Sequence, residues 1–242
     1  MNKVLKDVSI GEVGLRNQSN REVWLEKTLT AIPAGLRILD AGAGELQYKR
    51  FCTHLNYVSQ DFGKYEGAGN REGKQTGSWD NSKLDIVSDI TAIPEPDASF
   101  DAIMCIEVFE HIPEPAKAVK EFARLLKPGG TLIITAPFAS LTHFAPYHFA
   151  SGYTKYWYEK WLPEYEFMID EIVRNGNYFE YLAQEVRRIP GVAEQYGNRK
   201  ESLFGKMIRF GMLVLLHRLS HTDTGSGEML CYGLQVRAHK KT

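Results

Sequence analysis

Short runs without helical period alternate along this chain with stretches whose apolar residues recur at helical spacing. The short runs lie at 36–39, 57–61, 84–87, 100–106 and 131–135, and most are rich in apolar residues. Each predicts a buried strand. Helical spacing, capping residues and proline starts predict helices at about 19–33, at 46–53 and from Pro115. Pro128-Gly129-Gly130 is expected to end the helix that Pro115 begins.

The same pattern continues through the second half of the chain. It predicts a helix at 154–161, a strand at 167–172, helices at 178–188 and 203–218, and a final strand at 229–238. Strands that alternate with helices indicate right-handed crossovers and a parallel sheet. The fold class is therefore α/β, in a single domain with a helical insertion between its last two strands.

One segment, 62–83, does not fit this alternation. It contains five glycines and no helical period where a crossover helix is expected. We interpret it as a long ordered loop, or an insertion, that Trp79 helps to fix. Loops of this length in compact domains are uncommon and are often functional.

Composition and charge exclude several classes of protein. The 242 residues carry a formal net charge of -1, with 43% hydrophobic and 24% charged residues, as in ordinary globular proteins. Near-neutral charge argues against nucleic acid as a partner. Cys52, Cys105 and Cys231 have neither disulfide-framework nor zinc spacing. No apolar leader is visible at 1–10, and 210–216 is too short to span a bilayer, so a cytoplasmic location is expected.

The turn after the first strand is the main candidate for ligand binding. Asp40, Gly42 and Gly44 follow the apolar run directly, and glycine lets a ligand approach the bare backbone. Nucleotide-like ligands bind at the carboxyl ends of parallel strands in open α/β sheets. The dinucleotide fingerprint requires a third glycine where this chain has Gln47, which argues against an oxidoreductase. An acid before the glycines suits a ligand with an ammonium and a sulfonium group.

Taken together, an ordered set of motifs resembles the class I S-adenosylmethionine-dependent methyltransferases, specifically the type 11 methyltransferase group. The resemblance covers about 36–138. It rests on Ile38 to Gly44, Asp61, Ser88-Asp89-Ile90, Ser99 to Ile103, Glu107 to Ile112, and Leu125 to Gly130. It implies a Rossmann-like, doubly wound, mostly parallel seven-stranded sheet with an antiparallel last strand. It also implies a cofactor-binding core at 18–138 and an acceptor-side segment, helical insertion and last strand at 139–242.

The resemblance also assigns cofactor-binding residues. Asp40, Gly42 and Gly44 would hold the methionine part of S-adenosylmethionine, and Asp61 would accept hydrogen bonds from the ribose hydroxyls. The adenine would contact Asp89 and Ile90, and the sulfonium would lie near Ile106 and Glu107. Structural alternatives stay open, because Asp40 could cap a helix and Asp61 and Asp89 could be ordinary loop acids.

The expected activity is methyl transfer to oxygen or nitrogen of a small or medium-sized acceptor molecule. The alternatives are a non-catalytic S-adenosylmethionine-binding protein and, less favoured, a dinucleotide-dependent oxidoreductase. The aromatic stretch 137–165 supplies Tyr147 and Tyr153 as candidate substrate-binding residues, although core and pocket share this composition. His111 and His148 are the candidate catalytic residues. Each could instead be a structural histidine.

A metal site is a further hypothesis. Glu107, Glu110 and His111 are spaced i, i+3, i+4, and they would share one face if the strand turned at once into a helix. Such a group could hold a divalent cation that orients a hydroxylated acceptor. In the alternative, Glu107 offers mainly its backbone to the cofactor, and no metal ligand is assigned.

Overall fold

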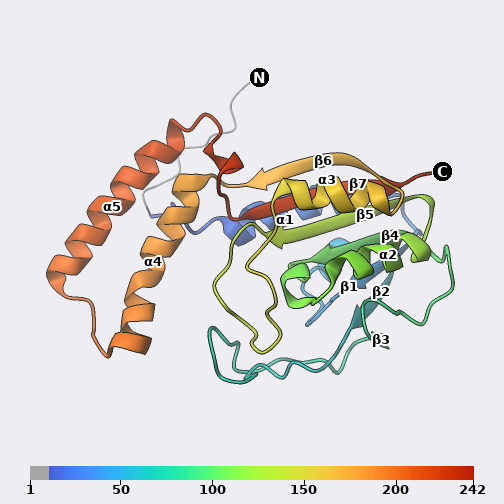
Figure 1. Ribbon diagram of the computed structural model, residues 1–242, viewed down its shortest axis with the longest axis horizontal. Helices are drawn as coiled ribbons and strands as arrows, with labels where there is room; N and C mark the ends of the chain where they lie inside the picture. Colours follow the sequence, from blue (N-terminus) through green and yellow to red (C-terminus); the bar gives the residue numbers. More distant parts are fainter. Residues whose placement is uncertain (1–10) are drawn as a thin grey trace. The chain divides into compact units, whose positions relative to one another are not determined.

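The computed structural model describes residues 11–242 and contains a seven-stranded sheet in the order β3-β2-β1-β4-β5-β7-β6 (Figure 1). The absence of an apolar leader at 1–10 was an expectation that lies outside the described residues. The strands are β1 (Arg37–Ala41), β2 (Asn56–Asp61), β3 (Ile86–Val87), β4 (Phe100–Ile106), β5 (Leu126–Pro137), β6 (Phe167–Asn175) and β7 (Gly233–Lys240). The helices are α1 (Asn17–Thr30), α2 (Pro115–Leu125), α3 (Lys155–Glu164), α4 (Tyr178–Gly197) and α5 (Leu203–His221).

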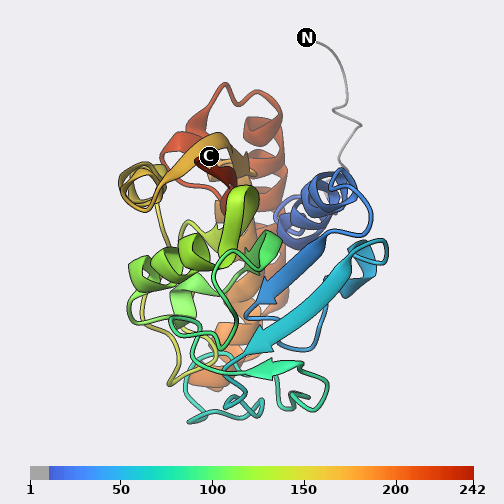
Figure 2. The ribbon, with the colours of Figure 1, turned by 90° about the vertical axis from the view of Figure 1, so that its right-hand side faces the viewer.

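The pairing of the strands confirms the expected fold class. β1 pairs in parallel with β2 and β4, β2 with β3, and β4 with β5, whereas β5 and β7 are antiparallel. The first three strands follow one another toward one edge of the sheet (Figure 2). The chain then returns to place β4 on the other side of β1. The strand order therefore reverses between β1 and β4, and ligands of open α/β sheets bind outside the carboxyl ends of the strands at such a point.

The core forms on the faces of these strands because neighbouring side chains in a parallel register point the same way. Ile38, Ala102 and Met104 share one face, where Leu25 and Leu29 of α1 cover them. Helix α2 buries the apolar positions predicted from its helical period, namely Ala118, Val119, Phe122 and Leu125. Its capping proline, Pro115, stands at the first helical position as expected.

Two local predictions were wrong. The expected crossover helix at 46–53 is only a single 3₁₀ turn, Lys49–Phe51, preceded by turns that begin with Leu46 at φ 62°. Pro128-Gly129-Gly130 does not end the helix, because α2 ends at Leu125 and these residues lie within β5. They occupy a shift in the β4–β5 register between Phe100 and Ala102, where an irregular strand tolerates proline and glycine.

The segment 62–83 is an ordered loop, as predicted. It contains no helix, and its one bridge joins Lys74 to His143. Its backbone approaches the segment after β5 closely, since a Cβ added at Gly69 would lie 2.0 Å from the Ala145 carbonyl oxygen. Glycine is thus required where the two segments meet.

The chain divides into two compact units. One contains Val23–Val173 and Gly233–Thr242, and it includes most of the sheet. The other contains 11–22 and Arg174–Tyr232. The single-domain organisation, with its expected boundaries at 18–138 and 139–242, stays a prediction.

The smaller unit has its own core and a buried acid. Leu213 and Leu216 of α5 pack with Ala183 and Val186 of α4. Glu180 accepts hydrogen bonds from the Gly14 N–H, the Arg16 guanidinium and the Tyr232 hydroxyl. Burial alone would raise the pKa of Glu180, but these donors outweigh it and hold the pKa below its usual value.

Among residues 11–242, no helix combines the length and the apolar character needed to cross a membrane.

Candidate active site

The glycine turn after β1 is tied to the end of β2 by backbone hydrogen bonds. The N–H groups of Gly42 and Ala43 both donate to the Gln60 carbonyl, at 2.8 and 2.9 Å. The Gly44 N–H donates to Asp61 Oδ2 at 3.1 Å. Hydrogen bonds therefore join the predicted glycine turn to the predicted acid, Asp61, at the carboxyl ends of β1 and β2.

The Asp61 carboxylate has the capacity that a ribose diol requires. Its other oxygen, Oδ1, accepts from the Gly63 N–H at 2.9 Å. An ionised carboxylate offers about four lone-pair positions, so two backbone donors leave acceptor capacity on each oxygen. Asp61 is buried, and this burial raises its pKa despite the backbone donors. Added hydroxyl donors would favour the ionised form.

Both glycines face side chains from other segments. A Cβ added at Gly44 would lie 2.5 Å from the Trp79 indole, and one added at Gly42 would lie 2.5 Å from the Val108 side chain. Gly44 also has φ 50°, where a side chain is strained. Trp79 thus anchors the 62–83 loop on the turn, as the sequence suggested.

Asp40 lies inward from the turn. It is 2% exposed and accepts a hydrogen bond from the Tyr57 hydroxyl. The register explains this contact, because Ile38 stands opposite Tyr57 and Asp40 opposite Ser59, on one face of the sheet. Burial raises the pKa of Asp40 to about 7, the Tyr57 bond opposes this rise, and Asp61 adds to it. A ligand ammonium would stabilise the ionised form.

The remaining candidate cofactor-binding residues lie just after β3 and at the end of β4. Asp89 is exposed, and its Oδ1 accepts from the N–H and hydroxyl of Thr91. Ile90 is partly buried beside it, and Ile106 is buried at the end of β4. Glu107 follows with φ 56°, and its carboxylate accepts from the Thr135 hydroxyl at 2.8 Å. The roles of these residues toward a cofactor stay predictions.

Three histidines gather beside the exit of β4. The His111 ring lies 4.6 Å from that of His143 and 6.0 Å from that of His148, centroid to centroid. His143 and His148 are 4.9 Å apart. Sequence analysis identified His111 and His148 but missed His143. The structure brings His143 in through the bridge to Lys74, a contact between segments far apart in the chain.

His111 is held in its neutral form. Its Nδ1 hydrogen-bonds the Tyr147 carbonyl, which can only accept, so Nδ1 carries the proton and Nε2 has a lone pair. Burial, with neighbouring His143 and His148, lowers the pKa of His111 to about 3, although the Tyr147 bond opposes this. A group with so low a pKa is a poor general base at neutral pH but a suitable metal ligand.

Aromatic side chains from the loop and from the segment after β5 surround these histidines. Phe144 stacks on Tyr65 and on His111, at centroid distances of 4.5 and 5.2 Å, and contacts Trp79 edge-on. Tyr147 contacts Phe62 at 4.8 Å. The predicted substrate residue Tyr147 therefore lies at the cluster. Tyr153 is buried, and its hydroxyl donates to the Phe109 carbonyl.

The structure brings together a different group of possible metal ligands from the one that the residue spacing suggested. No helix begins at Glu107, whose φ of 56° breaks the expected face. The ligand atoms that come together, within 4.8 Å, belong to Glu110, His111 and His143. Nε2 of His111 and of His143 lie 3.8 and 3.9 Å from Glu110 Oε1. Tetrahedral ligands about 2.1 Å from one ion lie roughly 3.4 Å from one another, so these groups stand slightly wider apart than a bound ion would hold them.

The donor set also indicates which divalent cation would fit. Two imidazoles and one buried carboxylate suit Zn²⁺, Fe²⁺ or Mn²⁺ better than Mg²⁺, which prefers oxygen ligands.

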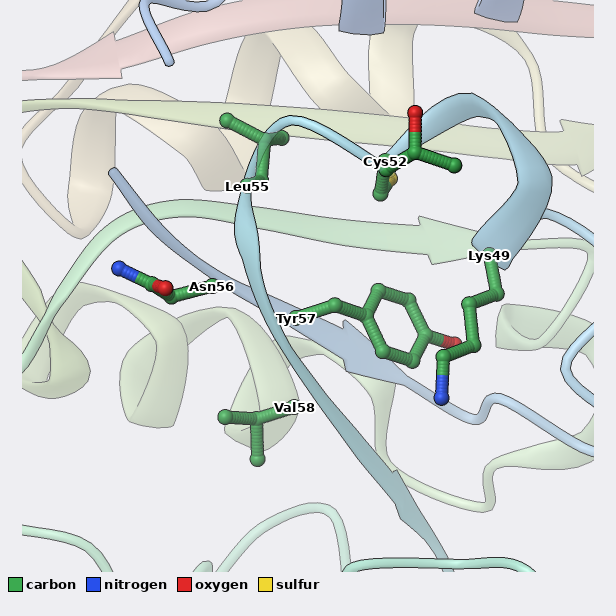
Figure 3. Close-up of a pocket in the computed structure, with 7 residues that line it drawn as sticks. Lys49, Cys52, Leu55, Asn56, Tyr57 and Val58 are labelled. Carbon is green, nitrogen blue, oxygen red and sulfur yellow. The ribbon is translucent and has the colours of Figure 1, made fainter. Parts of the chain in front are cut away.

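A surface hollow lies elsewhere, beside β2 and the 3₁₀ turn. Lys49, Cys52, Leu55, Asn56, Tyr57 and Val58 line it (Figure 3). None of the candidate site residues is among its lining residues. Only the Tyr57 hydroxyl links it to Asp40, so we place the candidate site at the strand ends instead.

The raised pKa of Asp40 predicts a particular pH dependence of stability. Between about pH 4, where the unfolded chain releases this proton, and pH 7, only the folded state keeps it. Stability should therefore fall as pH rises through this window, by up to about 1.4 kcal/mol per pH unit from this group. Asp40→Asn should remove the fall in urea unfolding curves. Asp85→Asn is the control, because the Ser59 bonds lower the pKa of Asp85. A fall that persists in Asp40→Asn contradicts the assignment.

The three-ligand group predicts a divalent cation site. Calorimetric titration of chelator-treated protein with Zn²⁺ or Mn²⁺ should show one site per chain. His143→Ala should weaken binding by at least about tenfold, whereas Glu107→Gln should not, because Glu107 accepts from Thr135. Equal binding by His143→Ala and the unchanged protein would show that these residues hold no metal.

Comparison with known proteins covers the segment that carries the glycine turn, Asp61 and His111. Residues 39–134 match the family model described as "Methyltransferase domain". A curated protein, the ubiquinone biosynthesis O-methyltransferase of Xylella fastidiosa (strain M23), is 39% identical over 115 residues, 46% of this chain and 46% of that protein. The chain thus spans about half the length of the curated relatives it matches.

Solved structures share the fold over almost the whole chain. A SAM-dependent methyltransferase from Archaeoglobus fulgidus has a TM-score of 0.56 at 14% identity, covering 96% of this chain and 98% of that one. Phosphoethanolamine N-methyltransferase 2 of Haemonchus contortus, in complex with S-adenosyl-L-methionine, has 0.53 at 18%, covering 92% and 52%. Residues 39–134 of this chain therefore match a methyltransferase domain, and the chain shares the fold of solved S-adenosylmethionine-dependent methyltransferases.

Proposed function

We propose that this protein is an S-adenosylmethionine-dependent methyltransferase that acts on a small or medium-sized acceptor, at oxygen in preference to nitrogen. The observation that carries the proposal is the Asp61 carboxylate, which is bonded to the glycine turn at the point where the strand order reverses. It lies inside the segment that matches the methyltransferase domain. Matched relatives named O-methyltransferases support oxygen as the accepting atom.

In this proposal the cofactor lies along the carboxyl ends of β1 and β2. Asp61 accepts from the ribose hydroxyls with the lone pairs that Gly44 and Gly63 leave open. Asp40 attracts the ammonium group through the low-dielectric interior. Asp89 and Ile90 flank the adenine, and Ile106 and Glu107 lie toward the sulfonium. When bound, S-adenosylmethionine supplies an electrophilic methyl group.

The protein's own contribution is chiefly positioning and proton removal. Holding donor and acceptor in line is worth about 7–11 kcal/mol. Phe144 and Tyr147 provide the apolar walls for the acceptor, and they exclude water from the reacting atoms. His148, whose Nε2 lies 3.2 Å from the Ser140 hydroxyl, takes the acceptor proton. His111, kept neutral, would hold a cation together with Glu110 and His143, and such a cation would orient the acceptor oxygen.

A non-catalytic cofactor-binding protein is the second candidate, since the turn and Asp61 account for binding alone. The grouped histidines favour catalysis, because a binding protein does not require them. An oxidoreductase is disfavoured by Gln47 and by the methyltransferase match.

Cofactor binding is tested at Asp61. Asp61→Ala should weaken S-adenosylmethionine binding by about 1.5–3 kcal/mol, the range for hydrogen bonds to a charged group, in titration calorimetry. Asp97→Ala is the matched control, because Asp97 is exposed and pairs with Arg124. Unchanged S-adenosylmethionine affinity in a folded Asp61→Ala protein would contradict the assignment of Asp61 to the ribose hydroxyls.

Proton transfer is tested at His148. His148→Ala should reduce kcat by roughly 10²–10⁴-fold, the usual contribution of a general base, and leave cofactor affinity nearly intact. His239→Ala, on β7, is the control, since His239 pairs with Asp170. Full turnover in His148→Ala would remove this residue from the mechanism. An equal loss of cofactor affinity would mean that the segment shapes the cofactor site instead.

A further inference from the structure

Helix α5 is apolar on two sides, and α4 covers only one of them. Leu213 and Leu216 face α4 and are buried; the two helices lie side by side in Figure 1. The outward side chains are exposed by 36–71% of their surface. This α5 apolar face consists of Phe204, Met207, Ile208, Met212, Leu215 and Leu219.

The spacing of these residues places them on one continuous surface. From Phe204 through Ile208, Met212 and Leu215 to Leu219 the steps are three or four residues, so the side chains lie along one helix face. At 1.5 Å per residue, the face is about 24 Å long. A helix that is apolar all round is normally covered on every side, and continuous exposed apolar surface marks an interaction site.

The charged residues within α5 are all basic. The helix contains no aspartate or glutamate, and Lys206 and Arg218 are exposed. Arg199 and Lys200 precede it in an exposed stretch. The nearby acid Glu201 is already paired with Arg209, at 2.7 and 2.8 Å. The charges around the apolar face therefore complement an anionic partner.

This charge pattern distinguishes between the occupants that could cover the face. In a twofold dimer the same patch meets itself, which would bring basic residues of α5 toward basic residues of the copy without acids from α5 to offset them. Like charges brought together across an interface oppose association. A bilayer surface with anionic headgroups supplies both parts of the match, because apolar side chains enter the acyl boundary and cations meet phosphates.

We propose that α5 is an interfacial anchor that binds the surface of a membrane containing anionic phospholipids. The helix lies in the plane of the interface with the α5 apolar face toward the acyl chains. Arg218 extends its apolar stem along the same surface and places its charged end among the headgroups, whereas Lys206, two residues from both Phe204 and Ile208, lies on the other side of the helix. This inference concerns the smaller unit and does not depend on the proposed methyl transfer.

The test uses the full chain and sedimentation with vesicles. The protein should sediment with vesicles of phosphatidylcholine and phosphatidylglycerol, and at least about tenfold more weakly with phosphatidylcholine alone. Binding should weaken as salt rises, because salt screens the headgroup charges. Absence of binding to the mixed vesicles overturns the proposal.

Matched variants assign the binding to α5. Met207→Glu should reduce vesicle binding at least about tenfold, whereas Met168→Glu, at an exposed methionine on β6, should leave it unchanged. Arg218→Gln should weaken the preference for phosphatidylglycerol. Thermal melts and S-adenosylmethionine titration show that each variant is folded, separately from vesicle binding.

Two further outcomes would contradict the proposal. Equal loss of vesicle binding in Met207→Glu and Met168→Glu would show that α5 is not the binding element. A dimer in sedimentation velocity that Met207→Glu dissociates, without vesicle binding by the native protein, would assign the face to a second copy of the chain.

Discussion

The hydrogen bond from the Gly44 N–H to the Asp61 carboxylate fixes the ends of β1 and β2 relative to each other, and the candidate site depends on it. The neighbouring N–H groups of Gly42 and Ala43 are satisfied by the Gln60 carbonyl. The turn therefore needs no ligand to complete its hydrogen bonds. A preformed acceptor at this position saves the ordering cost that binding otherwise carries.

The part of the site that contains the histidines depends on two segments whose backbones approach each other closely. The loop 62–83 pairs with the segment after β5, through hydrogen bonds from Lys74 N–H to the Thr142 carbonyl and from Phe144 N–H to the Lys74 carbonyl. These contacts hold His143 near His111, and the Phe144 ring stacks on Tyr65 of the loop. The glycine-rich composition of the loop follows from this geometry, because side chains at Gly69 would collide with Ala145.

Structural features that depend on local sequence patterns could be predicted, whereas features that depend on contacts between distant segments could not. The strands, the glycine turn and Asp61 could be predicted because apolar runs and turn chemistry are local signals. The helix expected at 46–53 was wrong because Leu46 adopts φ 62° and breaks it. The face that Glu107 would share with Glu110 and His111 does not form, because Glu107 has a backbone φ of 56° that no periodicity reveals. His143 was missed because only its bridge to Lys74 brings it to the site.

A crystal structure of the protein with S-adenosylhomocysteine tests the central claim most directly. The account predicts both ribose hydroxyls within about 2.5–3.0 Å of Asp61, the range for hydrogen bonds to an ionised oxygen, with Trp79 still against Gly44. A ligand bound away from the ends of β1 and β2, or a ribose without contact to Asp61, would contradict it.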